Sequence, residues 1–83
     1  MENKILNVTI IAGNVHQLRL AANLTQTELA KLIHVSTSSI NAWERGHTYP
    51  SLINVLSICN YFNVKVDDLI GVPTMKKKIV SML

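Results

Sequence analysis

Helix-breaking and helix-capping residues divide this sequence into short pieces, and that division limits the folds it can adopt. The breaks fall at Asn23, at residues 34–36 and 46–50, at Asn63 and at residues 71–73. Between them, apolar residues recur at the spacing of one helix face. Helices this short are marginal alone in water, so they must pack on one another to persist. We therefore expect one all-α domain of five short helices over residues 10–71.

The first two helices have clear local signals. Residues 15–22 form the first, which Asn23 ends because asparagine tolerates a left-handed backbone. Thr25-Gln26-Thr27-Glu28 is a capping-box sequence, in which a hydroxyl caps an orphan amide and a glutamate reaches back. It opens the second helix, which runs to about residue 33.

Three more helices complete the domain. Ser36 caps a helix over residues 37–45, Pro50-Ser51 opens a fourth, and a short fifth covers residues 66–70. Helical spacing predicts the inward-facing side chains, which are Val15, Leu18, Ala21, Ala22, Leu29, Ala30, Leu32, Ile33, Ile40, Trp43, Leu52, Val55, Leu56, Cys59 and Phe62.

The two ends of the chain differ from the helical region. Residues 1–9 are interpreted as an N-terminal extension and residues 72–83 as a C-terminal tail. Both contain β-branched or apolar residues with imperfect alternation, so strand, helix extension and disorder all remain open. A lone exposed strand is an aggregation hazard, which pairing with a second chain would remove.

The charge is mildly basic, with a formal net charge of +3 and a pI near 9.3. Over residues 14–71 the opposite charges balance, with basic Arg19, Lys31, Arg45 and Lys65 against acidic Glu28, Glu44, Asp67 and Asp68. The excess therefore lies in Lys76, Lys77 and Lys78, which are either a solvated tail or a contact for DNA or an acidic partner. A basic pI admits nucleic acid as a partner without identifying it.

Several classes of protein are excluded. The chain has no glycine-rich phosphate loop and no Ser/His/Asp or Cys/His set at a suitable spacing, so we expect no enzyme and no cofactor. The three histidines are not at zinc-ligand spacing with Cys59, so no metal site is expected. No apolar run reaches the length of a membrane span, and the lone Cys59 suits a reducing compartment, so a cytoplasmic location is expected.

Two short helices joined by a three-residue turn, over residues 25–45, form the pattern of a helix-turn-helix. In such a unit the second helix enters the major groove of DNA. Ala30 would face the partner helix, where a larger side chain would push the two apart. Ile40 and Trp43 would turn one face of the second helix into the core, leaving an opposite face of Thr37, Ser38, Asn41 and Ala42.

A run of motifs resembles a known family. These motifs are Leu24 through Ala30, Val35-Ser36, Ser39-Ile40, Trp43-Glu44-Arg45-Gly46, Pro50-Ser51-Leu52 and Val64 through Leu69. Together, over about residues 14–71, they resemble the Cro/repressor-type helix-turn-helix of the Xre family. The resemblance implies a five-helix, lambda-repressor-like domain. It also implies a transcription regulator that binds double-stranded DNA, usually as a homodimer on an operator with two half-sites.

The resemblance also implies roles for individual residues. Those that would bind phosphate are Thr25, Gln26, Ser36, Arg45 and His47. Those that would meet base edges are Thr37, Ser38, Asn41 and Ala42. Gln26 would in addition support the recognition helix.

Three positions stand out within the family pattern. Arg19 and Glu44 would form an internal ion pair between the first and third helices. His34 stands at a turn position usually held by glycine, and Lys65 stands where a serine usually caps the last helix.

Several of these residues also have a purely structural interpretation. The hydroxyls of residues 36–39 are typical of a helix start, and a glutamine in a first helical turn is often merely solvated. Cys59 reads as a buried, inert thiol. The apolar termini leave open a module that acts through a protein partner, such as an antitoxin or anti-regulator.

Overall fold

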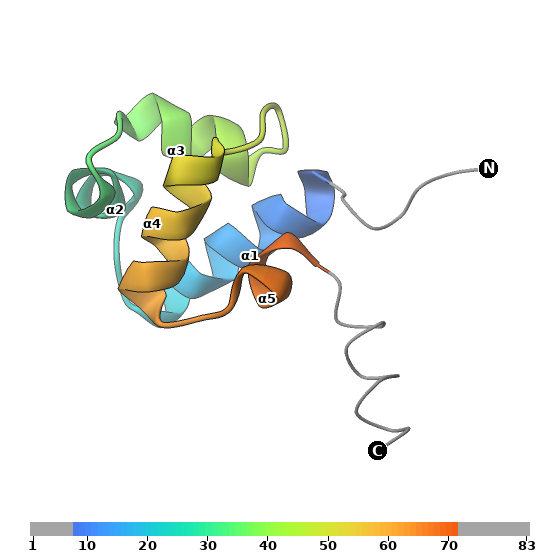
Figure 1. Ribbon diagram of the computed structural model, residues 1–83. Coiled ribbons are helices and arrows are strands. Elements are labelled where there is room, and N and C mark those ends of the chain that lie inside the picture. Colours follow the sequence, from blue (N-terminus) through green and yellow to red (C-terminus); the bar gives the residue numbers. More distant parts are fainter. Residues whose placement is uncertain (1–7, 72–83) are drawn as a thin grey trace, which may run out of the picture.

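Five α-helices follow one another in this all-α domain (Figure 1). The structure is a computed structural model and describes residues 8–71, with side chains from residue 10 onward. The helices are α1 (Val8–Ala21), α2 (Gln26–Ile33), α3 (Thr37–Glu44), α4 (Leu52–Phe62) and α5 (Val66–Ile70). The all-α, five-helix expectation is confirmed. The expectations for residues 1–7 and 72–83, including strand formation and the lysine run, lie outside the described residues.

Helix α1 is longer than its sequence pattern indicated. It begins at Val8, seven residues before the expected start at Val15, and ends at Ala21. Tertiary packing explains the extension, because Ile11 and Ala12 are buried beside Val15. The β-branched residues of this first turn have modest helix propensity, which burial of one helix face overrides.

Non-glycine residues with a left-handed backbone end three of the helices. Asn23 has φ 58°, His34 has φ 61° and Asn63 has φ 56°. After His34, the amide of Val35 donates to the carbonyl oxygen of Ala30 over 2.9 Å, which satisfies a carbonyl at the end of α2. His34, at a position that glycine usually holds in the family pattern, therefore adopts the left-handed conformation that the turn requires.

The core is built from every helix of the described region. Leu29, Ile40, Ile58, Leu69 and Val15 are its largest fully buried side chains. The inward orientation expected for Ala30, Ile40 and Trp43 is confirmed. Cys59 is also buried, and this burial, together with the nearby charge of Asp68, raises the pKa of its thiol. The thiol therefore stays protonated and poorly nucleophilic.

Some expected core residues lie on the surface instead. Leu32, Leu52 and Leu56 are exposed by 44%, 70% and 46%, and Ala21 and Ala22 are exposed as well. Helix α4 is apolar around most of its circumference, so its sequence pattern does not single out one face. The face of α4 that packs into the core contains Val55, Ile58 and Cys59. The sequence pattern did not predict that Ile58 is buried.

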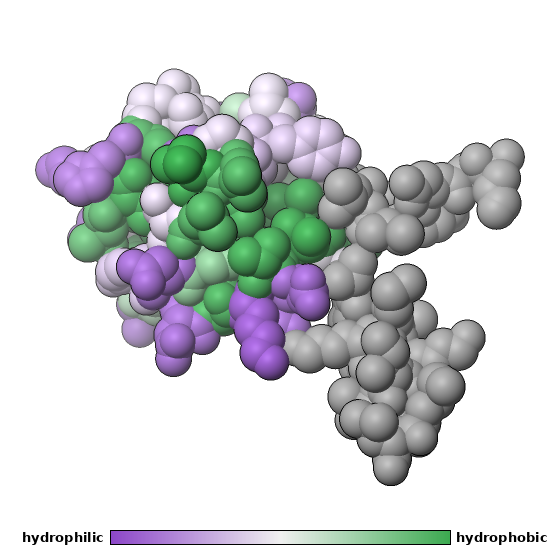
Figure 2. Space-filling view, in the orientation of Figure 1, coloured by the Kyte–Doolittle hydropathy of each residue, from purple (hydrophilic) through white to green (hydrophobic). Residues whose placement is uncertain are grey.

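A patch of hydrophobic side chains therefore lies in the middle of the face that carries α4, with more hydrophilic residues around it (Figure 2). Its most exposed members are Tyr49, Leu52, Ile53 and Leu56. Beside them lies a groove of about 400 Å³, lined by Ile11, Tyr49, Pro50, Leu52, Val55, Val66 and Ile70. We call Tyr49, Leu52, Ile53, Leu56 and this groove the α4 apolar face.

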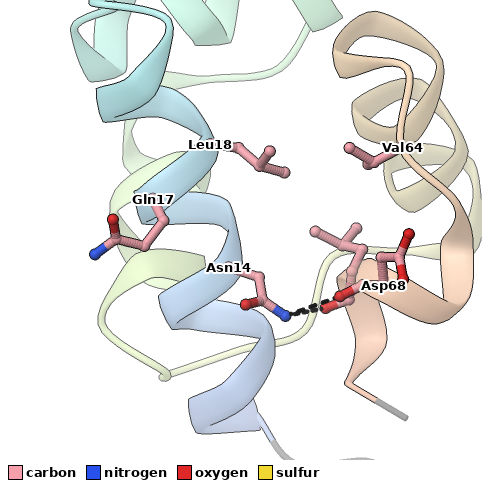
Figure 3. A pocket seen from close by; sticks show the side chains of 6 residues that line it. Asn14, Gln17, Leu18, Val64 and Asp68 are labelled. Carbon is pink, nitrogen blue, oxygen red and sulfur yellow. Dashed lines mark hydrogen bonds between the residues drawn. The ribbon is translucent and has the colours of Figure 1, made fainter. Parts of the chain in front are cut away.

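Helix α5 is short, and α1 holds it in place. The residue before it, Lys65, stands at the N-cap and makes no side-chain capping hydrogen bond, as expected from the missing serine. Asn14 of α1 instead donates to the carbonyl oxygens of Asp68 (3.1 Å) and Leu69 (2.8 Å), as Figure 3 shows. A small hollow of about 160 Å³ lies next to these bonds, between Leu18 and Val64.

Three glycine substitutions test this packing. At Gly71 (φ +87°) an added Cβ would collide with the Ile10 side chain, whereas at Gly46 (φ +74°) it would meet nothing within 4 Å. Gly46→Ala should lower the free energy of unfolding by about 1–2 kcal/mol, because alanine is strained in a left-handed backbone. Gly71→Ala should lower it by more, because the collision with Ile10 adds to the same strain. Gly13→Ala, at an open helical site, should stabilise by about 0.5–1 kcal/mol. Urea unfolding measures all three, and equal losses at Gly46 and Gly71 would contradict the close packing of α1 against the end of α5.

Candidate nucleic-acid interface

Helices α2 and α3 pack as a two-helix unit joined by a short turn. Ala30 of α2 is buried, while Ile40 and Trp43 of α3 point into the core. The side chain of Ser36 caps α3 by accepting from the amide of Ser39 over 3.1 Å. With its inner face held in this way, α3 presents its opposite face outward.

The outward face of α3 carries no charge. Thr37 and Ser38 are exposed, and Asn41 and Ala42 are half-buried on the same helix. The hydroxyl of Thr37 donates to that of Thr27 over 3.4 Å, so Thr27 of α2 adjoins this face. Sequence reasoning missed Thr27, although its place two residues after the Thr25 cap could have indicated it.

The N-terminus of α2 lies beside this face. The capping box is present, because Thr25 Oγ1 accepts from the amide of Glu28 (3.0 Å) and Glu28 Oε1 accepts from the amide of Thr25 (2.8 Å). Gln26 follows and donates from Nε2 to Asn41 Oδ1 over 3.5 Å and to Glu44 Oε1 over 3.2 Å. Gln26 therefore contacts two residues of α3, the helix that it was expected to support.

Arg45 and His47 follow α3 directly and are both exposed. The amide of Gly46 donates to the carbonyl oxygen of Trp43, and that of His47 to the carbonyl oxygen of Ala42. This pair of bonds is a Schellman motif, which turns the chain sharply at Gly46. It leaves both basic side chains at the C-terminal end of α3, next to the outward face.

A buried ion pair joins α1 to α3, as the family resemblance implied. Arg19 donates from Nε to Glu44 Oε2 over 2.6 Å and from a terminal nitrogen to Glu44 Oε1 over 2.9 Å. The two side chains are only 10% and 4% exposed. Arg19 also donates to the carbonyl oxygen of Leu24 over 2.8 Å, which ties the link between α1 and α2 to the same pair.

Glu44 is the centre of a larger network. His16 Nδ1 lies 2.9 Å from Glu44 Oε1 and acts as a donor there, because an ionised carboxylate can only accept. Burial raises the pKa of the Glu44 carboxyl, but hydrogen bonds from Arg19, His16 and Gln26 outweigh burial and hold the pKa below its ordinary value. Sequence reasoning missed His16, although residues three apart share a helix face and Arg19 lies at that distance.

The residues expected to contact DNA therefore lie near one another around α3, the start of α2 and the turn after α3.

Comparison with known proteins agrees with this geometry. A family model described as helix-turn-helix, HTH_3, matches residues 15–69. The chain belongs to this helix-turn-helix family. The resemblance to Cro/repressor-type domains is confirmed, and the family is one of DNA-binding transcription regulators rather than enzymes.

Two curated relatives illustrate the similarity. This helix-turn-helix protein is 39% identical over 57 residues to the HTH-type transcriptional activator BcrR of Enterococcus faecalis. The matched region covers 69% of the chain and 28% of BcrR. It is 34% identical over 62 residues to the antitoxin PezA of Streptococcus pneumoniae, covering 75% of the chain and 39% of PezA. The chain thus spans well under half the length of either relative.

A solved structure supports the lambda-repressor-like fold. The P22 c2 repressor protein, solved in complex with a synthetic operator, matches with a TM-score of 0.71 and 26% identity. The match covers 75% of this helix-turn-helix protein and 94% of the repressor chain.

Over residues 8–71 no helix has both the length and the apolar character to cross a bilayer.

The coupling of Arg19 to Glu44 can be measured by a double-mutant cycle. Arg19→Met leaves Glu44 as a buried carboxylate without its main partner, which should destabilise the domain by about 3–5 kcal/mol at pH 7. Arg19→Met/Glu44→Leu removes both charges and should recover most of this loss. Urea unfolding gives the free energies, and a double variant as unstable as the sum of the two single changes would contradict the coupling.

The same cycle has a defined pH dependence. Because folding lowers the pKa of Glu44, its stabilising contribution is complete above the unfolded pKa and disappears as the pH falls through the folded pKa. The penalty of Arg19→Met should therefore shrink as the pH falls below about 4.

Proposed function

We propose that this chain is a sequence-specific transcription regulator that places α3 in the major groove of its operator. The observation that carries this proposal is the uncharged, outward face of α3 beside the capped N-terminus of α2. The similarity to the P22 c2 repressor protein, which was solved with a synthetic operator, supports it. A cytoplasmic location, with access to DNA, forms part of the same proposal.

Short side chains determine how such a face would recognise bases. Thr37 and Ala42 suit contact with thymine methyl groups, whereas Ser38 and Asn41 suit hydrogen bonds to base edges. No arginine lies on this part of α3, so the common bidentate contact to guanine is missing. We infer an operator half-site weighted toward A/T, with part of the specificity from DNA shape. Selection of a G-rich consensus from random DNA would contradict this.

Phosphate contacts would surround this face. The first amides of α2 follow the Thr25 cap and are a suitable site for a phosphate, because the helix dipole adds to their free donors. Ser36 Oγ accepts from the amide of Ser39 and also lies 3.1 Å and 2.9 Å from the hydroxyls of Ser38 and Ser39, so a donor to phosphate would come from this group of hydroxyls. Arg45 and His47 supply exposed basic side chains at the other end of α3.

Two classes of substitution separate phosphate contacts from base contacts. Arg45→Ala should weaken binding about equally on all sequences and reduce the salt slope by about 1. Thr37→Ala should change the preferred base at one position instead, at a cost of about 1–3 kcal/mol for the preferred sequence. Fluorescence anisotropy on selected and scrambled DNA at several salt concentrations measures both. A change of base preference in Arg45→Ala, without one in Thr37→Ala, would show that the roles are wrongly assigned.

We also propose that the chain works as a homodimer through the α4 apolar face. A single domain of this size offers few base contacts, so a second copy on a half-site about one helical turn away would supply the missing affinity. Leu52 and Ile53 are exposed by 70% and 69%, in a contiguous surface that includes the groove under Tyr49 and Pro50. Apolar surfaces of this kind on small domains mark association sites.

Charged substitutions test this interface. Leu52→Glu with Ile53→Glu should convert a dimer at micromolar concentration to a monomer without changing the circular dichroism spectrum. Leu20→Glu, at an exposed leucine of α1 outside the α4 apolar face, is the matched control and should leave the dimer intact. Sedimentation measures the mass. A wild-type monomer at micromolar concentration, with one protein bound per operator, would refute the dimer.

A second candidate function is a module that acts through a protein partner, such as an antitoxin or anti-regulator. The similarity to the antitoxin PezA and the exposure of the α4 apolar face favour it. A gel shift on the DNA upstream of its own gene distinguishes the two functions. Specific retardation supports the regulator, whereas a stable complex with a neighbouring gene product, without DNA binding, supports the partner-binding module.

A further inference from the structure

His16 is the member of the Glu44 network that reaches the surface of the domain. Its side chain is 43% exposed, whereas that of Glu44 is only 4% exposed. The ring nitrogen Nδ1 of His16 lies 2.9 Å from Glu44 Oε1, and the same oxygen accepts from Gln26 Nε2 over 3.2 Å. His16 is therefore two hydrogen bonds away from the first residue of α2, whose N-terminus is a proposed phosphate site.

Glu44 determines which ring nitrogen of His16 carries a proton. Its carboxyl pKa is held below the ordinary value, so the group stays ionised and can only accept hydrogen bonds. Arg19 Nη2 also lies 3.3 Å from Nδ1, but it donates to Glu44 Oε1 over a shorter 2.9 Å. An unprotonated Nδ1 would set two lone pairs against each other at 2.9 Å. Nδ1 therefore keeps its proton whether the ring is neutral or charged.

The other ring nitrogen, Nε2, is the one that changes. Because the Nδ1 edge turns toward a buried carboxylate, the exposure of the His16 ring belongs to the edge that carries Nε2. Among the described residues no hydrogen bond reaches Nε2. With the proton on Nδ1, Nε2 of the neutral ring is an acceptor, whereas in the charged ring it is a donor. A phosphate oxygen of DNA only accepts, so only the protonated ring can bind it.

Two charged groups face the ring within the described part of the chain. Arg19, one turn further along α1, opposes a second positive charge, whereas Glu44 of α3 favours it. The residue that α2 contributes to this network, Gln26, is uncharged. A phosphate beside Nε2 would add a second negative group and favour the protonated ring.

The charged residues of the other neighbouring elements lie elsewhere. Helix α5, which carries Asp67 and Asp68, is held by Asn14 of α1. Residues two apart on a helix point in nearly opposite directions, so α5 lies on the other side of α1 from the ring. Arg45 and His47, in the turn after α3, are exposed.

We propose that His16 is a further phosphate contact of the DNA-binding surface, and that DNA binding takes up a proton at its ring. The protonated ring donates from Nδ1 to Glu44 and from Nε2 to a phosphate oxygen. This contact lies on α1, outside the two helices of the helix-turn-helix unit. The inference rests on the proposed DNA binding and leaves the roles proposed for the start of α2 and for Arg45 unchanged.

The proposal predicts a pH dependence that a contact from arginine lacks. An imidazole changes its charge between about pH 5 and 8, whereas a guanidinium stays charged. When the pH falls from 8 to 6, the affinity for DNA should rise by about tenfold, the usual value of one charge-assisted hydrogen bond. Selected and scrambled DNA should gain equally, because the contact is with the backbone. The salt slope should steepen by about 1.

Two substitutions distinguish the two ring nitrogens. His16→Asn keeps an N–H donor close to the position of Nδ1 and removes Nε2, whereas His16→Gln places an uncharged donor close to the position of Nε2. The chain has three histidines, so His34→Asn with His47→Gln gives a background in which His16 is the only one. Asparagine at position 34 tolerates the left-handed backbone. The replacement at position 47 removes a proposed phosphate contact that could itself titrate.

The experiment is fluorescence anisotropy with selected and scrambled DNA, at pH 6 and pH 8 and at several salt concentrations. The background protein should bind about tenfold more tightly at pH 6, with the steeper salt slope. Adding His16→Asn should abolish both changes and leave binding at pH 8 and the urea midpoint as they were. Adding His16→Gln should also abolish the pH dependence. Every other titrating group is common to these proteins, so their difference isolates His16.

Several results would overturn the proposal. One is a pH dependence of the same size with and without His16→Asn, and another is an equal loss in this variant at both pH values. Nitrogen NMR of the His16 ring in the wild-type protein is a check without substitution. The free protein at pH 8 should show the proton on Nδ1, and DNA should raise the pH at which Nε2 is protonated; a proton on Nε2 at pH 8 would contradict the mechanism. If the wild-type protein binds neither DNA at either pH, the proposed function itself fails, which is a separate outcome.

Discussion

The buried pair of Arg19 and Glu44 is the interaction on which the arrangement of the helices depends. It joins α1 to the C-terminal end of α3, and Arg19 also holds the carbonyl oxygen of Leu24 between α1 and α2. Removing two charges from water is costly, so such a pair adds little net stability compared with apolar residues of similar volume. Its contribution is geometric, because one carboxylate with four polar contacts tolerates few alternative placements of α3.

This geometry accounts for the character of the proposed interface. The charges inside the domain are used to position helices, and the outward face of α3 is left with hydroxyls, an amide and a methyl group. Small uncharged side chains allow close approach to base edges but provide little long-range attraction. Over residues 14–71 basic and acidic residues balance, so the helical region attracts DNA less through net charge than through the fit of its surface.

The α4 apolar face shows a different use of the same limited core. A domain of this size has one small interior, and a helix that is apolar on most sides cannot bury all of them. Val55, Ile58 and Cys59 fill that interior, which leaves Leu52, Ile53 and Leu56 in contact with water. The exposure therefore follows from the number of apolar residues on α4 relative to the space beneath it.

Local chemistry could be predicted from the sequence, because its causes lie within a few residues. The caps at Thr25 and Ser36, the left-handed ends at Asn23 and His34 and the unfilled cap at Lys65 all depend on near neighbours in the chain. The inward faces of α2 and α3 followed from helical spacing, with the exception of Leu32. The family resemblance supplied the pairing of Arg19 with Glu44.

Tertiary structure alone decided the features that depend on distant partners. It lengthened α1 to Val8, because burial of Ile11 outweighs the weak propensity of that turn. It chose which stripe of α4 is buried, since the space available is set by the other helices. It also brought His16 and Gln26 to Glu44, across 28 and 18 residues of sequence. The spacing of His16 and Arg19 shows only that the two share a helix face, because their common partner Glu44 comes from a distant helix.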